Sequence, residues 1–115
     1  MALGGTGNEV FERSVAEGKA LGLRPFLYTH PCGLFGHSAG PTIGLWDHQK
    51  GDIPRGERKV FKDTSYALEL SILEYLDCYK QDTFIFTEET VVLHDGVVSF
   101  LDDRRDKLTV LRAAS

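Results

Sequence analysis

The chain has few cysteines, no long apolar run and no excess of positive charge. Cys32 and Cys78 are the two cysteines among 115 residues, too few for a disulfide framework or a closed cysteine–zinc site. We therefore expect reduced thiols in a cytoplasmic protein. A formal net charge of -4 offers no electrostatic footprint for nucleic acid or for an anionic membrane. The N-terminus lacks the basic-then-apolar profile of a signal peptide, and no apolar run approaches the length of a membrane span.

The composition fits one small globular domain. Hydrophobic residues make up 42% of the chain and charged residues 26%, both ordinary for a globular protein. A chain of 115 residues can bury one modest core. There is no internal repeat, low-complexity tract or linker, so we expect a single domain over residues 1–115.

The order of elements predicts an α+β fold. Thr6 and Glu9 have the spacing of a capping box, and the apolar residues that follow recur at helical spacing until Gly22. This pattern predicts one amphipathic helix over about residues 7–21. The remaining expectations are strands over 25–29, 83–93 and 97–101, a turn at 94–96, an exposed loop over 47–63, a charged turn over 102–107, and a last short strand compatible with 108–111.

Residues 64–76 suit either a helix or a strand. In a strand, Glu69 shares a face with Ala67 and Ser71, because side chains alternate between the two faces. The apolar residues between them, Tyr66, Leu68, Leu70 and Ile72, then take the other face. A lone carboxylate among small residues is typical of a position that faces a site.

Alternation also separates the two glutamates of the strand expected over 83–93. Glu88 falls on the face of Phe84, Phe86 and Val92, whereas Glu89 falls with Thr83, Thr87 and Val91. A carboxylate on the more apolar face costs several kcal/mol of desolvation unless something compensates it. A metal ion is one such compensation.

A glycine-punctuated loop over residues 36–48 adds histidines to these carboxylates. Its glycines let the backbone bend sharply and approach a bound ion or ligand closely. One histidine and two carboxylates from separate elements, His37, Glu69 and Glu88, suit manganese, cobalt, zinc or iron better than copper(I) or a thiolate cluster. Two alternatives stay open. His37 can be a loop histidine bonded to backbone with both glutamates exposed, or Cys32 can be a thiol nucleophile beside His30 or His37.

Five stretches together carry a family resemblance over nearly the whole chain. They are TGNEV at 6–10, YTHP at 28–31, GHSAGPTIGLWD at 36–47, YALEL at 66–70 and EETVV at 88–92. In this order they resemble the C-terminal part of the pita-bread metallopeptidases, which include aminopeptidase P (Xaa-Pro aminopeptidase), prolidase and methionine aminopeptidase. The resemblance implies a partial pita-bread fold, with one N-terminal helix and a mainly antiparallel curved sheet.

The resemblance also implies roles for four residues. His37 matches the histidine ligand of the family's Gly-His motif, and Glu88 matches the glutamate that bridges two metal ions. Glu69 matches a glutamate ligand whose motif usually continues with proline, where this chain has Leu70. His48 corresponds to the second active-site histidine, which contacts substrate and shuttles protons, although its distance from His37 is longer here than in the better-known members. The implied cofactor is manganese, cobalt or zinc, with two ions in the complete family.

The family's site also needs two aspartates from strands that precede the TGNEV segment, and residues 1–5 do not supply them. We therefore expect a truncated Xaa-Pro aminopeptidase-like metallopeptidase, the C-terminal half of a catalytic domain. The complete family removes N-terminal residues from peptide substrates through metal-activated water; this chain alone should bind metal weakly and show little or no activity. The alternative functions are a non-catalytic pita-bread binding module and a coincidental likeness. Apolar faces left uncovered predict self-association or pairing with a missing N-terminal half.

Overall fold

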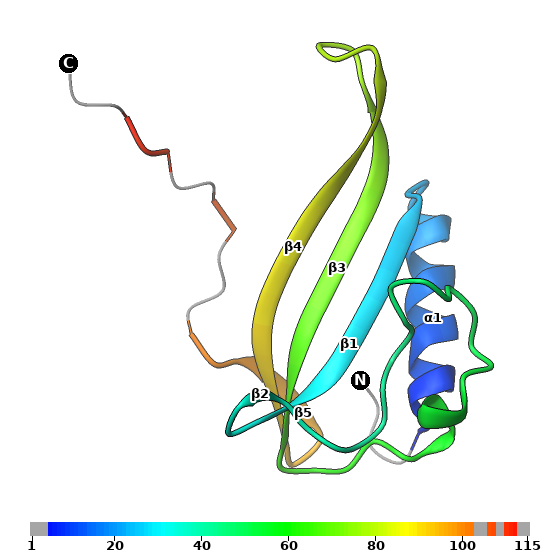
Figure 1. Cartoon of the computed structure of the whole chain (residues 1–115), viewed down its shortest axis with the longest axis vertical. Coiled ribbons are helices and arrows are strands. Elements are labelled where there is room, and N and C mark those ends of the chain that lie inside the picture. Colours follow the sequence, from blue (N-terminus) through cyan, green and yellow to red (C-terminus); the bar gives the residue numbers. More distant parts are fainter. Residues whose placement is uncertain (1–4, 103–105, 108–109, 113–115) are drawn as a thin grey trace.

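The computed structural model is an α+β fold with one helix and a five-stranded antiparallel sheet (Figure 1). It describes residues 5–102, 106–107 and 110–112. The strand order is β2-β1-β3-β4-β5. In chain order the elements are α1 (Gly7–Ala20), β1 (Pro25–Gly33), β2 (Gly36–His37), the short 3-10 helix η1 (Pro54–Glu57), β3 (Thr64–Leu76), β4 (Gln81–His94) and β5 (Val97–Phe100).

The capping box predicted for α1 is confirmed. The Thr6 hydroxyl accepts from the Glu9 N–H at 3.2 Å, and the Glu9 carboxylate accepts from the Thr6 N–H at 2.8 Å. Two orphan amides of the first turn are thereby satisfied. The helix ends at Ala20, one residue before the predicted end, and Gly22 follows with a φ of +79°.

The ambiguous segment, residues 64–76, is strand β3. It pairs with β4 along its whole length, from Thr64 opposite Leu93 to Leu76 opposite Gln81. The turn predicted at 94–96 is confirmed, and Asp95 and Gly96 both have positive φ, as a two-residue hairpin loop requires. The charged turn and the last strand predicted over 102–107 and 108–111 lie partly outside the described residues. The described residues 110–111 are not in a strand.

Strand β1 runs four residues past the predicted end, because Pro31 does not interrupt it. The Pro31 carbonyl accepts from the Ser38 N–H at 2.9 Å on the outer side of β1, away from β3. The N–H that proline lacks would therefore also face outward, where no ladder bond to β3 is lost. Breaking the strand at Thr29 was wrong for this reason.

Gly44 shows what the glycine-rich loop does. Its φ is +73°, and a Cβ at this position would lie 2.2 Å from the Leu27 carbonyl oxygen. Next to it, Ile43 and Thr29 exchange backbone hydrogen bonds at 2.8 and 3.0 Å. At Gly44 the loop thus lies against the edge of β1, whereas its predicted approach to a bound ion or ligand stays a prediction.

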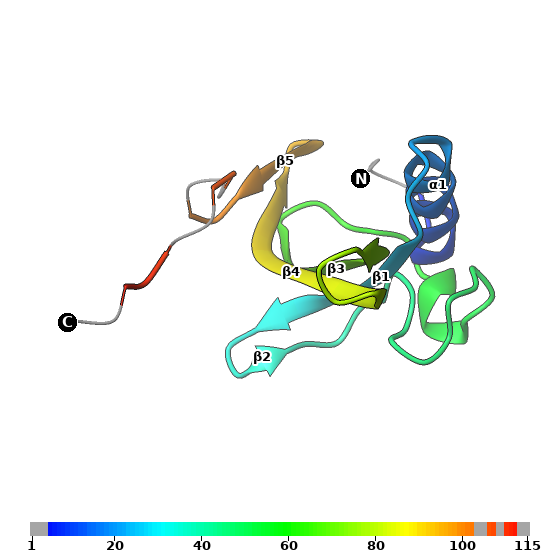
Figure 2. The ribbon, with the colours of Figure 1, turned by 90° about the horizontal axis from the view of Figure 1, so that it is seen from above.

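The sheet has one covered face and one open face. In Figure 2, α1 and β5 lie on one side of the sheet and the β1–β2 hairpin projects on the other. The covered face holds the core, in which Tyr66 and Leu93 are completely buried. The other core residues are Val10, Phe11, Leu27, Ile43, Val60 and Val91. Within the described residues, no helix has the length and apolar character needed to cross a membrane.

The open face is the other side of the same strands. Register places Phe26, Tyr28, His30 and Cys32 of β1, Glu69 and Ser71 of β3, and Phe84, Phe86 and Glu88 of β4 on it. The predicted alternation is confirmed, since Glu69 shares this face with Ser71, Glu88 shares it with Phe84 and Phe86, and Glu89 takes the other face.

Candidate functional site

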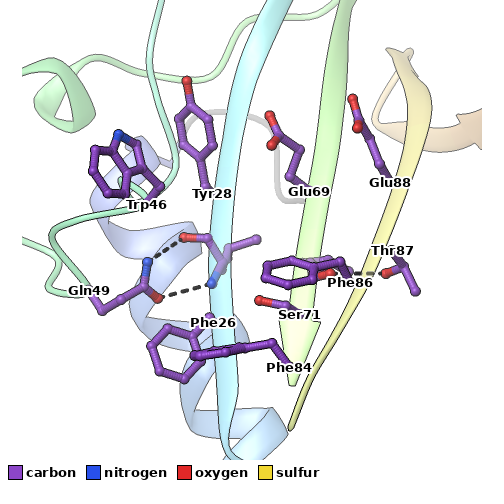
Figure 3. A pocket seen from close by; sticks show the side chains of 12 residues that line it. Phe26, Tyr28, Trp46, Gln49, Glu69, Ser71, Phe84, Phe86, Thr87 and Glu88 are labelled. Atoms are coloured by element: carbon purple, nitrogen blue, oxygen red, sulfur yellow. Dashed lines mark hydrogen bonds between the residues drawn. The ribbon is translucent and has the colours of Figure 1, made fainter. Parts of the chain in front are cut away.

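Three strands bring two predicted ligands together on the open face. Glu69 of β3 lies directly opposite Tyr28 of β1 on one side and opposite Glu88 of β4 on the other. Directly opposite residues of antiparallel strands have Cβ atoms about 5 Å apart. Figure 3 shows the two carboxylates pointing the same way from neighbouring strands.

A pair of stacked histidines adjoins this row. The His37 ring stacks on the His30 ring, with centroids 3.9 Å apart and planes 17° from parallel. His30 Nε2 lies 3.2 Å from Glu69 Oε1. His37 lies in the short strand β2, opposite Cys32 of β1, which explains its place beside His30. The structure therefore connects His37 to Glu69 through His30, a residue that sequence reasoning considered only as a partner of the Cys32 thiol.

The hydrogen bond at Nδ1 of His30 determines whether Nε2 of the same ring can act as an acceptor. Nδ1 lies 3.0 Å from the Pro31 carbonyl oxygen, which can only accept, so Nδ1 carries the proton. In the neutral ring, Nε2 then presents a lone pair to the Glu69 carboxylate. Two acceptors in contact need a proton or a cation to hold them together. Two ligands of a tetrahedral ion at about 2.1 Å each lie about 3.4 Å apart, close to the 3.2 Å found here, and a hydrogen-bonded histidine–carboxylate pair has a similar separation.

The described residues supply only part of a metal site. His30 and Glu69 have suitable chemistry and separation, and Glu88 is a cross-strand neighbour. However, no group of three or more His, Cys, Asp or Glu side chains within the described ranges is arranged to hold an ion. Glu88 is also exposed, so the desolvation cost expected for it does not arise, because the apolar side chains on its face are themselves open to solvent. The metal-ligand assignment stays a prediction.

The charges of the two glutamates affect their neighbours. Burial, and then the negative charge of Glu69, raise the pKa of the Tyr28 hydroxyl. Burial, followed by the charge of Glu88, raises the pKa of the Cys32 thiol. A nucleophilic cysteine needs a lowered pKa, so this environment argues against Cys32 as a nucleophile. The same negative field favours a cationic ligand.

An aromatic cleft of about 440 Å³ continues from the two carboxylates. Phe84 packs edge-on against Phe26 at 4.9 Å and stacks on Phe86 at 5.6 Å, between ring centroids. Trp46 forms the opposite wall, beside Tyr28 (Figure 3). A mostly apolar cleft with carboxylates at one end suits a short peptide whose positively charged end lies at the acidic end.

Gln49 fixes the loop that carries Trp46. Its side-chain oxygen accepts from the Leu27 N–H at 3.0 Å, and its side-chain nitrogen donates to the Leu27 carbonyl at 3.1 Å. The same nitrogen donates to the Leu45 carbonyl at 2.6 Å. The loop is thereby attached to β1 next to the cleft.

His48 does not line the cleft. Its Nε2 lies 2.5 Å from Asp52 Oδ1 within the same loop, and this hydrogen bond is the main reason why the pKa of Asp52 is lowered. The neighbouring Trp46 and Gln49 line the cleft instead. The structure therefore does not bring His48 together with Glu69 and Glu88, and its predicted proton-shuttling role stays a prediction.

Sequence reasoning gave Tyr28 and Trp46 no role in this site, and it considered His30 only beside Cys32. Continuing the alternation through Phe26, Tyr28, His30 and Cys32 would have placed Tyr28 and His30 on one face of a longer strand. Ending the predicted strand before Pro31 hid that signal. Trp46 carried no local signal, since its position depends on contacts that Gln49 makes with β1.

Comparison with known proteins adds no assignment. No family model, no curated protein and no solved structure matches this chain.

Proposed function

We propose that the open face is the C-terminal half of a metal-assisted peptide site of the Xaa-Pro aminopeptidase type. The observation that carries the proposal is the juxtaposition of Glu69 with Glu88 and with the stacked pair His30 and His37. These residues come from four strands and meet on one face beside a cleft.

Each group has a role in this proposal. His37, Glu69 and Glu88 contribute metal ligands, and His30 orients Glu69 or binds beside it. The aromatic cleft holds the peptide's side chains. In the complete family, bound metal supplies an activated water. Because the resemblance requires two further aspartate ligands, this chain alone should bind metal weakly and have little or no peptidase activity. The free thiols Cys32 and Cys78 support a cytoplasmic location.

Calorimetric titration with manganese or cobalt chloride tests the metal proposal. Wild type should release measurable heat, and Glu88→Gln should lose most of it. Glu89→Gln is the matched control, since it removes the same charge from the next residue of β4 on the opposite face. It should bind like wild type. His37→Ala should weaken binding as well.

The proposal is wrong if wild type and all three variants give the same curves. A loss that is equal in Glu88→Gln and Glu89→Gln would indicate a diffuse charge effect instead of a site on the open face.

A non-catalytic binding module is the second candidate. It is favoured by the engagement of His48 with Asp52 and by the aromatic lining of the cleft. Trp46 is the only tryptophan of the chain and lines the cleft, so its fluorescence reports on occupancy. A Xaa-Pro peptide that shifts this emission equally with and without manganese supports the binding module. A shift that needs manganese supports the metal-assisted site.

A further inference from the structure

The outer edge of β1 is covered by the chain itself. Gln49 bonds both the N–H and the carbonyl of Leu27, and Ile43 bonds both groups of Thr29. The Pro31 carbonyl accepts from Ser38. The backbone groups that face outward from these residues of β1 therefore have partners.

Among the described residues, the outer edge of β4 is covered at one end only. β5 pairs with β4 from Val91 to His94, and the Leu101 N–H adds one bond to the Thr90 carbonyl at 2.9 Å. In the part of the chain that the structure describes, no strand lies beside the outer edge of Thr83–Thr87. An exposed edge with unpaired backbone groups is a template for another strand.

The bond at Thr90 shows which residues of β4 present their backbone to this edge. Backbone groups of successive residues alternate between the two neighbours of an antiparallel strand. Since the Thr90 carbonyl faces outward, so do the N–H and carbonyl groups of Phe84 and Phe86. Those of Ile85 face β3.

The exposed segment has a self-complementary sequence. Thr83–Thr87 reads Thr-Phe-Ile-Phe-Thr, which is the same in both directions about Ile85. An antiparallel partner runs in reverse. A two-fold axis at Ile85 therefore places Phe84 opposite Phe86 of a second copy, and Thr83 opposite Thr87 of that copy.

We propose that this edge of β4 pairs with the same edge of a second copy of the chain, forming a homodimer with a continuous sheet. Phe84 of each copy forms a backbone hydrogen-bonded pair with Phe86 of the other copy, because the backbone groups of both residues face the edge. Cross-strand aromatic pairs and threonine pairs stabilise such an interface. The interface is isologous, so it closes as a dimer.

Exposure and charge agree with this occupant. Phe86 is 76% exposed and Ile85 is 41% exposed in the single chain, and the pairing covers both. The segment carries no charge. Its flanking residues Asp82 and Glu88 would face each other across the two copies, and Asp82 is already paired with Arg24 at 2.8 Å.

The dimer also extends the aromatic cleft. Phe84 and Phe86 line the cleft within one chain. The two-fold axis is perpendicular to the sheet, so the open faces of both copies lie on the same side. The proposal does not depend on metal binding, and it stands or fails separately from the proposed function.

Cysteine cross-linking tests the register. In a Cys78→Ser background, which removes the exposed native thiol, Ile85→Cys should form a disulfide-linked dimer under mild oxidation. The axis places this residue opposite itself at a distance that a disulfide can span. Thr83→Cys alone should stay monomeric, since it faces Thr87, and the double variant Thr83→Cys/Thr87→Cys should cross-link. Equal cross-linking of Ile85→Cys and Thr83→Cys would overturn the proposed register.

Sedimentation over a concentration series tests the dimer without cross-links. Wild type should associate, and Phe86→Lys should weaken association by about tenfold or more, because edge lysines block strand pairing. Phe35→Lys is the matched control, as Phe35 is 93% exposed and lies in the turn between β1 and β2. It should associate like wild type. A monomer at every concentration, or equal weakening by both variants, would contradict the proposal. If Phe86→Lys does not fold, the cross-linking result decides.

Discussion

The two faces of the sheet are built from alternate residues of the same strands, yet they have different properties. On the covered face Tyr66, Val91 and Leu93 pack with α1 and the connecting segments, and each is almost completely inaccessible. On the open face Glu69 and Glu88 lie beside a cleft in which Phe86 remains largely exposed.

The covered face stabilises the fold, and the open face carries the groups that can bind a ligand. Apolar burial on the covered face supplies the free energy of folding. The open face has little apolar burial to lose, so it can carry carboxylates, histidines and exposed aromatic rings. Substitutions on the covered face should therefore lower stability, whereas substitutions on the open face should change binding and leave stability nearly unchanged.

Tyr66→Ala should give the largest effect. It removes a completely buried aromatic side chain from the covered face, so we expect a loss of about 3–5 kcal/mol in the free energy of unfolding. Phe86→Ala, at an exposed position of the open face, should change it by no more than about 0.5 kcal/mol. Urea denaturation measures both. Similar losses in the two variants would mean that the faces do not differ as described.

Gly44→Ala should give the next largest effect. The added Cβ meets the Leu27 carbonyl oxygen and the Phe11 ring, and φ is positive, so we expect a loss of about 2–4 kcal/mol. Gly36→Ala is the control: its φ is +93° but no atom lies within 4 Å of the added Cβ. It should lose only about 1 kcal/mol. Thermal unfolding compares the two variants, and equal losses would show that the contact with β1 is unimportant.

Tyr66→Phe should stabilise the protein slightly. The Tyr66 hydroxyl is buried without a hydrogen-bond partner among the described residues, so its removal should add about 1 kcal/mol at neutral pH. Burial also raises the pKa of this hydroxyl from 10.0 to about 12. The folded state therefore favours the neutral phenol. The contribution of this preference to the free energy of unfolding is complete below pH 10 and is lost as the pH rises toward 12.

Melting temperatures between pH 8 and about pH 12 test this linkage. Wild type should lose stability above pH 10, and Tyr66→Phe should lose less. Parallel curves would contradict the assignment of the alkaline loss to Tyr66.

Glu88→Gln should have the smallest effect on stability. Glu88 is exposed on the open face, so we expect a change within about 0.5 kcal/mol. Chemical denaturation of this variant also shows that any loss of metal binding is not caused by unfolding. A loss above about 2 kcal/mol in the free energy of unfolding would show that Glu88 stabilises the fold, contrary to its assignment to the site.

Much of the fold could be predicted from local signals. The Thr6 and Glu9 capping box gave the start of α1, and the turn at 94–96 followed from its glycine. Residues 64–76 could not be assigned, because their leucines and glutamates suit a helix and only pairing with β4 decides for a strand.

The candidate site was predicted in part. Alternation separated Glu88 from Glu89, since it depends only on strand geometry. That Glu69 shares a face with Glu88 follows from the register of β3 with β4, which alternation within one strand does not give. The stack of His30 on His37 could not be foreseen, because it depends on the pairing of β2 with β1 past Pro31. The position of His48 depends on its hydrogen bond with Asp52, a contact that the spacing of motifs does not show.

Paramagnetic broadening by manganese tests most directly whether the open face holds a cation. Two-dimensional amide spectra recorded during a manganese chloride titration locate the ion along the chain. We predict that the amide signals of His30, Glu69 and Glu88 broaden first, while those of α1 remain sharp. Broadening that begins at the acidic residues of α1, or that spreads evenly over the spectrum, would contradict a cation site on the open face.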